Sequence, residues 1–217
     1  VTSEWVKVCK SWAALESIFL ASADIRSQLP DDTKRFEGID SEFKDLMKEA
    51  VTVPSVVQVC TAEGRGELLK DMTKRLELCQ KALNEYLDVK KKIFPRFYFV
   101  SNVALLQILS NGNNPPQIMP YIGDCYDSLR LLTQPEEGSE LALSQEVMDM
   151  GGWSKVGLIM VAKDGEEIPM PVKFHMTGAV EDWLNKLTVA MQLALMTQLS
   201  DSLENAVNWE LDDASAR

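Results

Sequence analysis

The chain has 217 residues, and its 22 Lys and Arg stand against 33 Asp and Glu, which gives a formal net charge of −11. This length predicts one or two domains, and 46% hydrophobic with 25% charged residues is typical of folded proteins, which disfavours wholesale disorder. The negative charge disfavours nucleic acid and anionic membrane surfaces, and the longest apolar run, 158–162, is far shorter than the ~20 residues that span a bilayer.

The first part of the chain favours two amphipathic helices. Residues 4–29 place apolar side chains at spacings of three and four, the pattern of a helix with one buried face. Pro30 is predicted to end this helix, and 31–33 (DDT) offers N-caps for a second helix over about 33–51. Gly38 weakens that helix by about 1 kcal/mol relative to Ala. The segment 53–60 is apolar but interrupted by Pro54, so its state stays open.

Residues 67–94 give the clearest signal, which is a heptad seam. Positions on the seam follow an unbroken alternation of three and four, and seven of the eight are apolar or aromatic: Leu69, Met72, Leu76, Cys79, Leu83, Tyr86, Lys90 and Ile93. At 1.5 Å per residue the predicted helix is about 40 Å long. Pro95 should stop it, because proline removes a helix hydrogen bond.

The middle of the chain continues with short elements. Residues 96–100 are predicted to be extended, and Ser101 or Asn102 to cap a helix through Leu109. The composition of 110–116 predicts a loop. A further helix is then expected, with one apolar face formed by Ile122, Cys125, Tyr126, Leu129 and Leu132, followed by a second loop over 134–139.

A β-hairpin is the one strong strand signal. An apolar run over 153–162 and a return over 167–174 flank 163–166 (KDGE), and Asp-Gly between two such runs is typical of a type I′ turn. Pro169 and Pro171 predict that the return strand lies at a sheet edge, because proline cannot donate to the ladder.

The last predicted element is a long helix over about 178–207. Its apolar stripe consists of Val180, Trp183, Leu184, Leu187, Met191, Ala194, Leu195, Leu199, Leu203 and Val207. Taken together, the elements predict a mainly α fold, an elongated bundle of long helices with one β-hairpin. We divide the chain into 1–65, 66–150 and 151–217 as its expected parts.

A search for catalytic motifs yields no site. The only histidine, His175, favours an ordinary residue at a strand end over a catalytic base. The glycine clusters at 64–66 and 151–152 match no phosphate-binding loop and are interpreted as turns. Four pairs of adjacent acids favour solvated surface, since neighbouring residues point apart: Asp31–Asp32, Glu136–Glu137, Glu166–Glu167 and Asp212–Asp213. We therefore predict no catalytic, cofactor-binding or metal-binding residue.

Two further groups of residues are informative. Cys9, Cys60, Cys79 and Cys125 are widely spaced without a CxxC pair, which predicts free thiols in a reducing compartment. The only basic cluster consists of 90–92 and Arg96. It is interpreted as the solvated C-terminal end of a helix, where the helix dipole favours positive charge, or as a docking site for an acidic partner. The chain lacks an initial Met; a trimmed chain is one explanation, and a segment cut from a longer polypeptide is the one we expect.

One set of segments resembles a known family. Residues 83–87 (LNEYL), 94–102 (FPRFYFVSN) and 105–112 (LLQILSNG) are similar to the linker region of dynein heavy chains. Downstream, the likeness continues through the KDGE turn and Pro169 to the helix start at 180–184 (VEDWL), so it covers about 66–200. The first 60 residues agree only in helical character. The form of 110–112 and of 116–126 is more similar to axonemal outer-arm chains than to cytoplasmic ones.

The resemblance implies a mechanical role without chemistry of its own. The dynein linker precedes the first AAA module, arches over the ATPase ring and swings between bent and straight states, which is the power stroke. ATP, Mg²⁺ and microtubules are bound by other parts of such a heavy chain. The implied partner is the AAA ring of the same chain, with other dynein subunits as further candidates, and the implied location is the axoneme of a cilium or flagellum, with the cytoplasm as the alternative.

Within this frame, two groups of residues become candidate sites. Phe94, Pro95, Arg96, Phe97, Tyr98 and Phe99 form a predicted structural corner, at which each aromatic ring can bury about 150–250 Å² and fix the angle between two stiff segments. Arg96 is expected to stack on a ring or to pair. The hairpin tip is the candidate contact with the ring and consists of Lys163, Asp164, Gly165 and Glu166.

Two other functions stay open on the sequence. A stand-alone helical adaptor could dock a partner through the heptad helix, and an acidic helical enzyme could use His175. The sequence beyond Arg217 would separate the motor from the adaptor, because a Walker A motif further along favours the motor.

Overall fold

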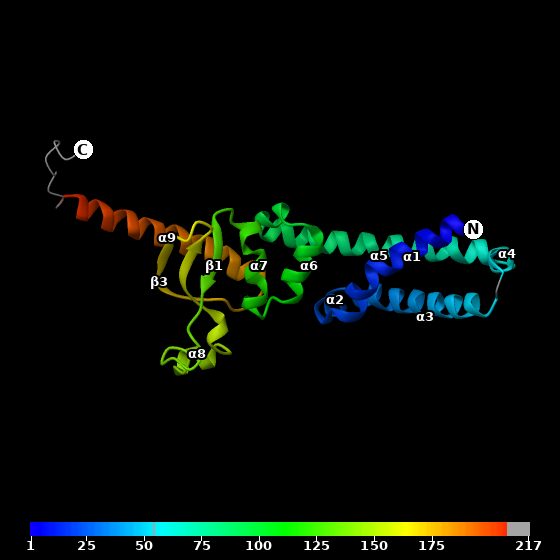
Figure 1. Ribbon diagram of the computed structural model, residues 1–217, viewed down its shortest axis with the longest axis horizontal. Helices are drawn as coiled ribbons and strands as arrows, with labels where there is room; N and C mark the ends of the chain where they lie inside the picture. Colours follow the sequence, from blue (N-terminus) through cyan, green and yellow to red (C-terminus); the bar gives the residue numbers. More distant parts are fainter. Residues whose placement is uncertain (54, 208–217) are drawn as a thin grey trace. The chain divides into compact units, whose positions relative to one another are not determined.

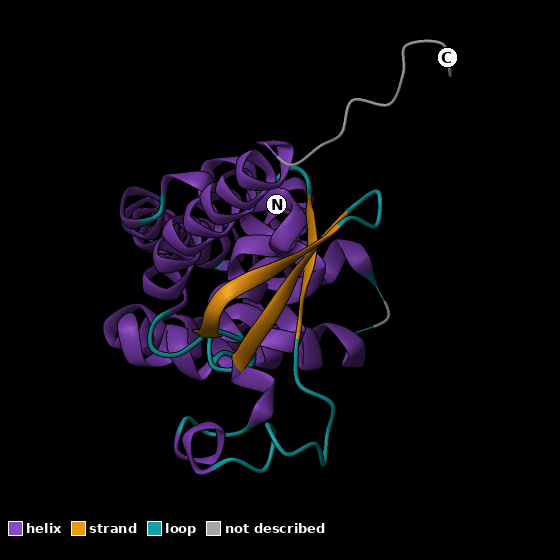
Figure 2. Ribbon diagram, turned by 90° about the vertical axis from the view of Figure 1, so that its left-hand side faces the viewer, coloured by secondary structure: helices purple, strands orange, loops and turns teal. Residues whose placement is uncertain are grey.

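The computed structural model describes residues 1–53 and 55–207, and the chain divides into two compact units, Val1–Lys90 and Lys91–Arg217 (Figure 1). This division falls inside the predicted middle part, so the three-part division remains a prediction. The described residues are mainly helical with one small sheet, which confirms the mainly α class (Figure 2). No disulfide links the four cysteines, and Cys79 and Cys125 are buried, so the predicted free thiols are confirmed.

All regular elements among the described residues of the first unit are helices. Its elements are α1 (Thr2–Glu16), a π-helical turn (Ser17–Ala21), α2 (Ala23–Gln28), α3 (Pro30–Thr52), α4 (Val56–Thr61) and most of α5 (Arg65–Ile93). Phe19 stacks on Phe36 with ring centroids 5.3 Å apart, and both are fully buried, which fixes the start of α3 against the π-helical turn. The segment 53–60, whose state the sequence leaves open, contains most of α4, whose N-cap is Ser55.

The prediction of a single helix over 4–29 is wrong, because the helix is interrupted at Ser22. Its backbone is extended (φ −83°, ψ 112°), and its hydroxyl accepts a hydrogen bond from the amide of Ile25, so serine caps α2 instead of continuing the first helix. The predicted N-caps of the second helix are also displaced. Leu29 is the N-cap of α3, and Pro30 takes the first helical position, where its missing N–H costs nothing.

The heptad seam is confirmed over the first part of α5 only. The five seam positions from Leu69 to Leu83 are buried as predicted. Further along, Leu87 is buried in place of Tyr86, which is half-buried, and Ile93 is 44% exposed. The reason is geometric: a straight helix has 3.6 residues per turn, so a 3.5-residue stripe drifts around it by about 20° per heptad.

The second unit combines short helices with a sheet. It contains a 3₁₀ turn (Pro95–Phe99), α6 (Asn102–Ser110), α7 (Pro115–Cys125), β1 (Leu129–Thr133), α8 (Gln145–Asp149), a second 3₁₀ turn (Trp153–Lys155), β2 (Val156–Ala162), β3 (Glu167–His175) and α9 (Val180–Val207). Ser101 caps α6, as predicted, through a hydrogen bond from the amide of Ala104 to its hydroxyl. The extended state predicted for 96–100 is wrong, since a 3₁₀ turn forms there.

The sheet is antiparallel with the order β1-β2-β3, so the hairpin is confirmed but has a third strand beside it. The prediction that helix continues to Leu132 is wrong. A bulge between Leu129 and Leu131 lets Leu129 and Leu132 both lie on the buried side, and this spacing of three imitates a helix. The placement of Pro169 and Pro171 on an edge strand is confirmed, because β3 is an edge.

Helices pack against both edge strands of the sheet: α7 packs against β1, and α9 packs against β3. The long C-terminal helix is confirmed, and its predicted stripe is buried from Val180 to Leu187. Trp183, Leu184 and Leu187 are fully buried there. By contrast, Leu195, Leu199 and Leu203 are exposed, so the predicted stripe does not form one buried face. The side chain of Val207 lies outside the described residues.

Candidate functional site

Only two of the four aromatic rings of the predicted corner are buried. Phe94 and Phe97 are buried, and their rings meet edge to face with centroids 4.9 Å apart. The expectation that Tyr98 and Phe99 bury their rings is wrong, because they are 61% and 78% exposed. A 3₁₀ turn repeats every three residues, so positions 94, 97 and 100 share the inner side and the two residues between them face outward.

Arg96 both stacks and pairs, as expected. Its guanidinium lies 4.9 Å from the ring centroid of Tyr126, and Nη1 donates a hydrogen bond to the carbonyl oxygen of Cys125 at 3.1 Å. A planar guanidinium suits this double role, since it stacks through its face and donates through its edge. Arg96 therefore holds the end of α7 against the 3₁₀ turn.

Tyr126 connects this turn to α9. Its ring is buried beside Phe94, and its hydroxyl donates to the carbonyl oxygen of Leu184 at 2.8 Å. The same hydroxyl lies 2.9 Å from the hydroxyl of Thr188, one turn further along α9. Burial raises the pKa of Tyr126 to about 12, an effect that the Thr188 hydrogen bond partly opposes. Tyr126 is therefore a neutral hydrogen-bonding group at physiological pH.

A second hydrogen bond reaches α9 from the end of α5. The side-chain amide of Asn185 donates to the carbonyl oxygen of Ile93 at 3.1 Å. Ile93 is the last residue of α5, where helix carbonyls lack partners within the helix. We call the group formed by Ile93, Arg96, Tyr126, Asn185 and Thr188 the junction. It joins segments up to 92 positions apart in sequence.

Sequence reasoning found only part of the junction. Arg96 was a candidate and Tyr126 was assigned to a helix face, but Asn185 and Thr188 were not singled out. Neither has a local signal, since a polar residue on a helix next to apolar ones is ordinary. Their partners lie 92 and 62 positions away, and only the packing of α9 brings them together.

The hairpin tip is exposed, but it is not the predicted type I′ turn. Among the described residues, only glycines have positive φ, so Asp164 does not adopt the conformation that type I′ requires. Instead the amide of Gly165, with φ +96°, donates to the carbonyl of Ala162 at 3.1 Å, and the amide of Ala162 donates to the carbonyl of Glu166. This is a three-residue loop with a glycine bulge.

The tip also contacts the segment before β1. The amide of Lys163 donates to the carbonyl of Ser128 at 2.9 Å, and its ammonium lies 3.4 Å from Asp127. Both charged side chains are largely exposed, so this ion pair adds little stability. The backbone bond therefore fixes the tip, while the charges of Lys163, Asp164 and Glu166 remain open to solvent.

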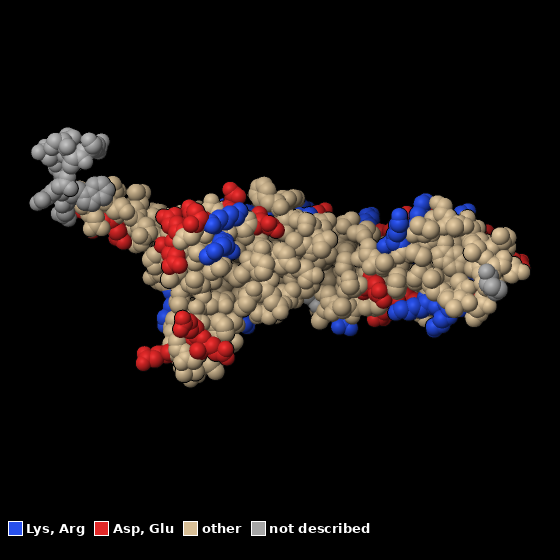
Figure 3. All heavy atoms as spheres, in the orientation of Figure 1, with Lys and Arg blue, Asp and Glu red and all other residues tan. Residues whose placement is uncertain are grey.

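His175 lies at the end of β3 and contacts Glu146 of α8, with Nε2 3.0 Å from the carboxylate. Lys173 lies 3.2 Å from the other carboxylate oxygen, and this hydrogen bond, more than the histidine, lowers the pKa of Glu146. Figure 3 shows acidic side chains gathered over the segment that carries α8. These contacts of Lys173 and His175 with Glu146 hold α8 to the sheet.

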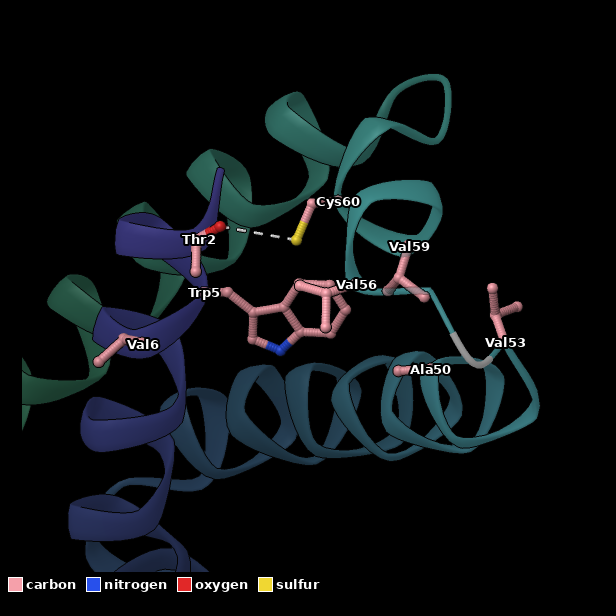
Figure 4. A pocket seen from close by; sticks show the side chains of 8 residues that line it. All are labelled: Thr2, Trp5, Val6, Ala50, Val53, Val56, Val59 and Cys60. Carbon is pink, nitrogen blue, oxygen red and sulfur yellow. Dashed lines mark hydrogen bonds between the residues drawn. The ribbon is translucent and has the colours of Figure 1, made fainter.

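The first unit contains an apolar hollow of about 240 Å³ between α1, α4 and the end of α3, lined by Thr2, Trp5, Val6, Ala50, Val53, Val56, Val59 and Cys60 (Figure 4). The thiol of Cys60 lies 3.7 Å from the hydroxyl of Thr2. Next to the hollow, the buried Arg65 pairs with Glu49 at 2.6 Å and lies over the ring of Trp5. None of the predicted site residues lines this hollow.

Two searches over the described residues complete the description. No group of three or more His, Cys, Asp or Glu in that part of the chain is placed to hold a metal ion. Within the same residues, no helix combines the length and the apolar character that crossing a membrane requires.

Comparison with known proteins places these features in a family. Residues 1–202 match the family model described as dynein heavy chain, N-terminal region 2. The flagellar outer-arm dynein beta chain of Chlamydomonas reinhardtii is 39% identical over 203 residues, 94% of this chain and 4% of that protein. Dynein axonemal heavy chain 17 of Homo sapiens is 40% identical over 203 residues, which are again 94% of this chain and 4% of that protein.

The likeness extends to an inner-arm chain. The dynein-1-beta heavy chain of the flagellar inner arm I1 complex of C. reinhardtii is 32% identical over 201 residues, which is 93% of this chain and 4% of that protein. The chain thus spans only a small part of the length of these relatives. With the family model matching nearly its whole length, the chain belongs to the dynein heavy chain family.

Proposed function

We propose that this chain is a segment of the mechanical linker of an axonemal dynein heavy chain. In this role it passes conformational changes of the AAA ring, driven by ATP turnover, into the power stroke for microtubule-based movement of cilia or flagella. Family membership is the observation that carries the proposal. The relatives named above are flagellar or axonemal chains, which supports the axoneme as the location.

The junction supports a force-transmitting role on physical grounds. A lever segment has to resist bending where one stiff element meets another, and close-packed interiors have low compressibility. At the junction the end of α5, the 3₁₀ turn, the end of α7 and α9 are held by buried rings and by hydrogen bonds of 2.8–3.1 Å. A change in direction at this point would have to break several of these contacts together.

The segment has no chemistry of its own in this proposal. ATP and Mg²⁺ would be bound by other parts of the heavy chain, and microtubules would be reached only through distant parts. The AAA ring of the same chain is the proposed partner, and the exposed hairpin tip is the proposed contact. Other dynein subunits are further candidate partners.

A variant of the junction in the complete heavy chain tests the role. Tyr126→Ala removes the ring and both of its hydrogen bonds, and should lower microtubule gliding velocity at least several-fold while basal ATPase activity persists. Tyr126→Phe retains the ring and should have a smaller effect. If Tyr126→Ala left both gliding and ATPase coupling unchanged, or reduced them in equal proportion, the linker role would be wrong for this segment.

Charge reversal tests the ring contact separately. Lys163→Glu with Glu166→Lys inverts the tip without altering net charge, and should change gliding velocity and the coupling of ATPase to microtubules. The matched control is Lys81→Glu with Glu85→Lys, which exchanges the charges of an exposed ion pair on α5. An effect no larger than that of the control would remove the tip as a contact.

A stand-alone helical adaptor is the second candidate, and the length of the relatives is why we place it behind the linker. The adaptor would dock a partner through α5. Its test is the complete reading frame, because a Walker A motif in the same polypeptide supports the linker, while a frame limited to this segment supports the adaptor.

A further inference from the structure

The outer side of the 3₁₀ turn is an exposed aromatic surface that the junction does not use. Its two outward residues, Tyr98 and Phe99, are 61% and 78% exposed, and Val103 of α6 is 73% exposed. The ammonium of Lys91 joins these parts, since it lies 5.8 Å from the ring centroid of Tyr98 and donates a 2.8 Å hydrogen bond to Asn102. A single exposed apolar residue is ordinary, but such a group marks an interaction site. We call this surface the aromatic face; it consists of Lys91, Tyr98, Phe99 and Val103.

The surroundings of the aromatic face are positively charged. Between Asp88 and Asp124 the sequence has four basic residues and no acidic one, although the chain as a whole has a net charge of −11. Lys92, which follows Lys91 in the chain, is exposed. Aromatic rings beside uncompensated positive charge fit a partner that is acidic and also offers apolar side chains.

The same unit carries a segment of this opposite character. Between Arg130 and Lys155 the sequence has five acidic residues and no basic one. One of them, Glu146, holds α8 to the sheet, and the other four are exposed: Glu136, Glu137, Glu140 and Asp149. Leu143 and Met148 are 67% and 57% exposed among them. We call residues 136–149 the acidic segment.

The aromatic face and the acidic segment lie apart within one copy of the second unit. Figure 1 shows α8 on a projection below the sheet and α6 on the far side of α7, well away from it. Complementary surfaces that do not meet within one copy can be joined between two copies. Such a contact is heterologous, because each copy contributes a different surface to it.

We propose that the aromatic face of one copy of this chain docks on the acidic segment of a second copy. The rings of Tyr98 and Phe99 bury against Leu143 and Met148, and the lysines face the carboxylates. The rings supply buried apolar area, while the charges select the partner and its orientation. The occupant is argued from charge and apolar content together, since the acidic segment offers both. The proposal does not rest on the lever role.

Isotope-labelled cross-linking of the complete heavy chain tests the contact. Heavy chain labelled with heavy nitrogen carries a photo-cross-linking amino acid at Phe99, and it is mixed with unlabelled heavy chain that lacks this amino acid. Mixing at high salt screens charge contacts and lets the copies exchange before the salt is lowered. Mass spectrometry then identifies the captured peptide, and an unlabelled peptide comes from a second copy. The matched control carries the same amino acid at Val189, which is 64% exposed on α9 of the same unit.

We expect the Phe99 position to capture unlabelled peptides from 136–149 at least five-fold more than the Val189 position does. Capture of labelled 136–149 alone would place the contact inside one copy, and capture mainly of another segment or polypeptide would give the aromatic face a different partner. Either result, or equal yields at the two positions, would overturn the proposal. Because gliding is not measured, failure of the lever role would leave this result unaffected.

A charge swap tests whether the charges select the partner. Glu136→Lys with Glu137→Lys in the unlabelled copy should lower the yield of cross-linked heavy-chain pairs at least five-fold, because like charges then oppose each other. Adding Lys91→Glu with Lys92→Glu to the labelled copy should recover most of this loss. The control is Glu63→Lys with Glu67→Lys, the same change of charge at exposed positions of the first unit, which should leave the yield unchanged. A loss equal to that of the control, or no recovery after the swap, would contradict the proposed docking.

Discussion

The side-chain amide of Asn185 in α9 donates a 3.1 Å hydrogen bond to the carbonyl oxygen of Ile93, the last residue of α5. This bond supplies a partner to one of the helix carbonyls that have none inside the helix. It also joins α9 to the last residue of α5 across 92 positions of sequence. Within the second unit, the junction therefore holds the final residue of α5 to α9.

Replacement of Asn185 should weaken this connection measurably. Asn185→Ala removes the donor, and we expect a loss of about 0.5–1.5 kcal/mol in the free energy of unfolding, the usual net value of one hydrogen bond. Urea denaturation of the 217-residue chain measures it. Lys186→Ala, at the exposed neighbouring position, should change the free energy by less than about 0.5 kcal/mol. Equal effects of the two variants would argue against the bond.

The hydroxyl of Tyr126 should make stability fall at alkaline pH. The folded-state pKa is about 12, against about 10 for an unperturbed tyrosine, so the folded state keeps the proton longer than the unfolded state. The contribution is complete below about pH 10 and is lost as the pH rises through 12. Burial raises the pKa of Cys125 in the same direction, so the wild-type profile contains both contributions.

Tyr126→Phe isolates the tyrosine part of this profile. The variant should be less stable by about 0.5–1.5 kcal/mol at neutral pH, and its free energy of unfolding should fall less steeply than that of the wild type between pH 10 and 12. Urea denaturation at several pH values measures both effects. Parallel profiles for the two proteins would show that Tyr126 ionises normally.

Lysine should not replace Arg96 without cost. Arg96→Lys keeps the positive charge but loses the planar group that stacks on Tyr126 and donates to the carbonyl of Cys125. We expect a loss of about 0.5–2 kcal/mol in thermal or urea unfolding. Lys92→Arg, an opposite exchange at an exposed position nearby, is the control and should be nearly neutral. Full stability of Arg96→Lys would mean that only the charge matters.

Two glycines should respond to alanine in opposite directions. Gly38 lies inside α3, where an added Cβ meets no atom within 4 Å, so Gly38→Ala should stabilise the chain by about 0.5–1 kcal/mol. Thermal unfolding measures the change. A destabilised variant would show that the helix is not as exposed at Gly38 as the structure has it.

Gly165 differs because its φ is +96°, a conformation that strains any residue with a side chain. Gly165→Ala should destabilise the hairpin by about 1–3 kcal/mol although an added Cβ meets no neighbour. The readout is the rate of hydrogen exchange in β2 and β3. Exchange as slow as in the wild type would indicate that the loop adopts another turn.

Prediction from the sequence succeeded where local signals decide. Periodic apolar residues identified α3, most of α5 and α9, and the Asp-Gly signal with two prolines identified the hairpin and its edge strand. It failed where a short local choice competed with periodicity. Ser22 interrupts the helix that the apolar pattern predicts to continue, and the bulge beside Leu129 gives a strand the spacing of a helix.

By itself, the sequence determined the helical class, the free thiols and the segments on which the family resemblance rests, because these follow from composition and from patterns within a few turns of chain. Only the tertiary structure decided which residues form the junction and which apolar side of α9 stays exposed. Asn185, Thr188 and Tyr126 meet partners 58–92 positions away, and no local pattern encodes a contact that depends on how separate elements pack.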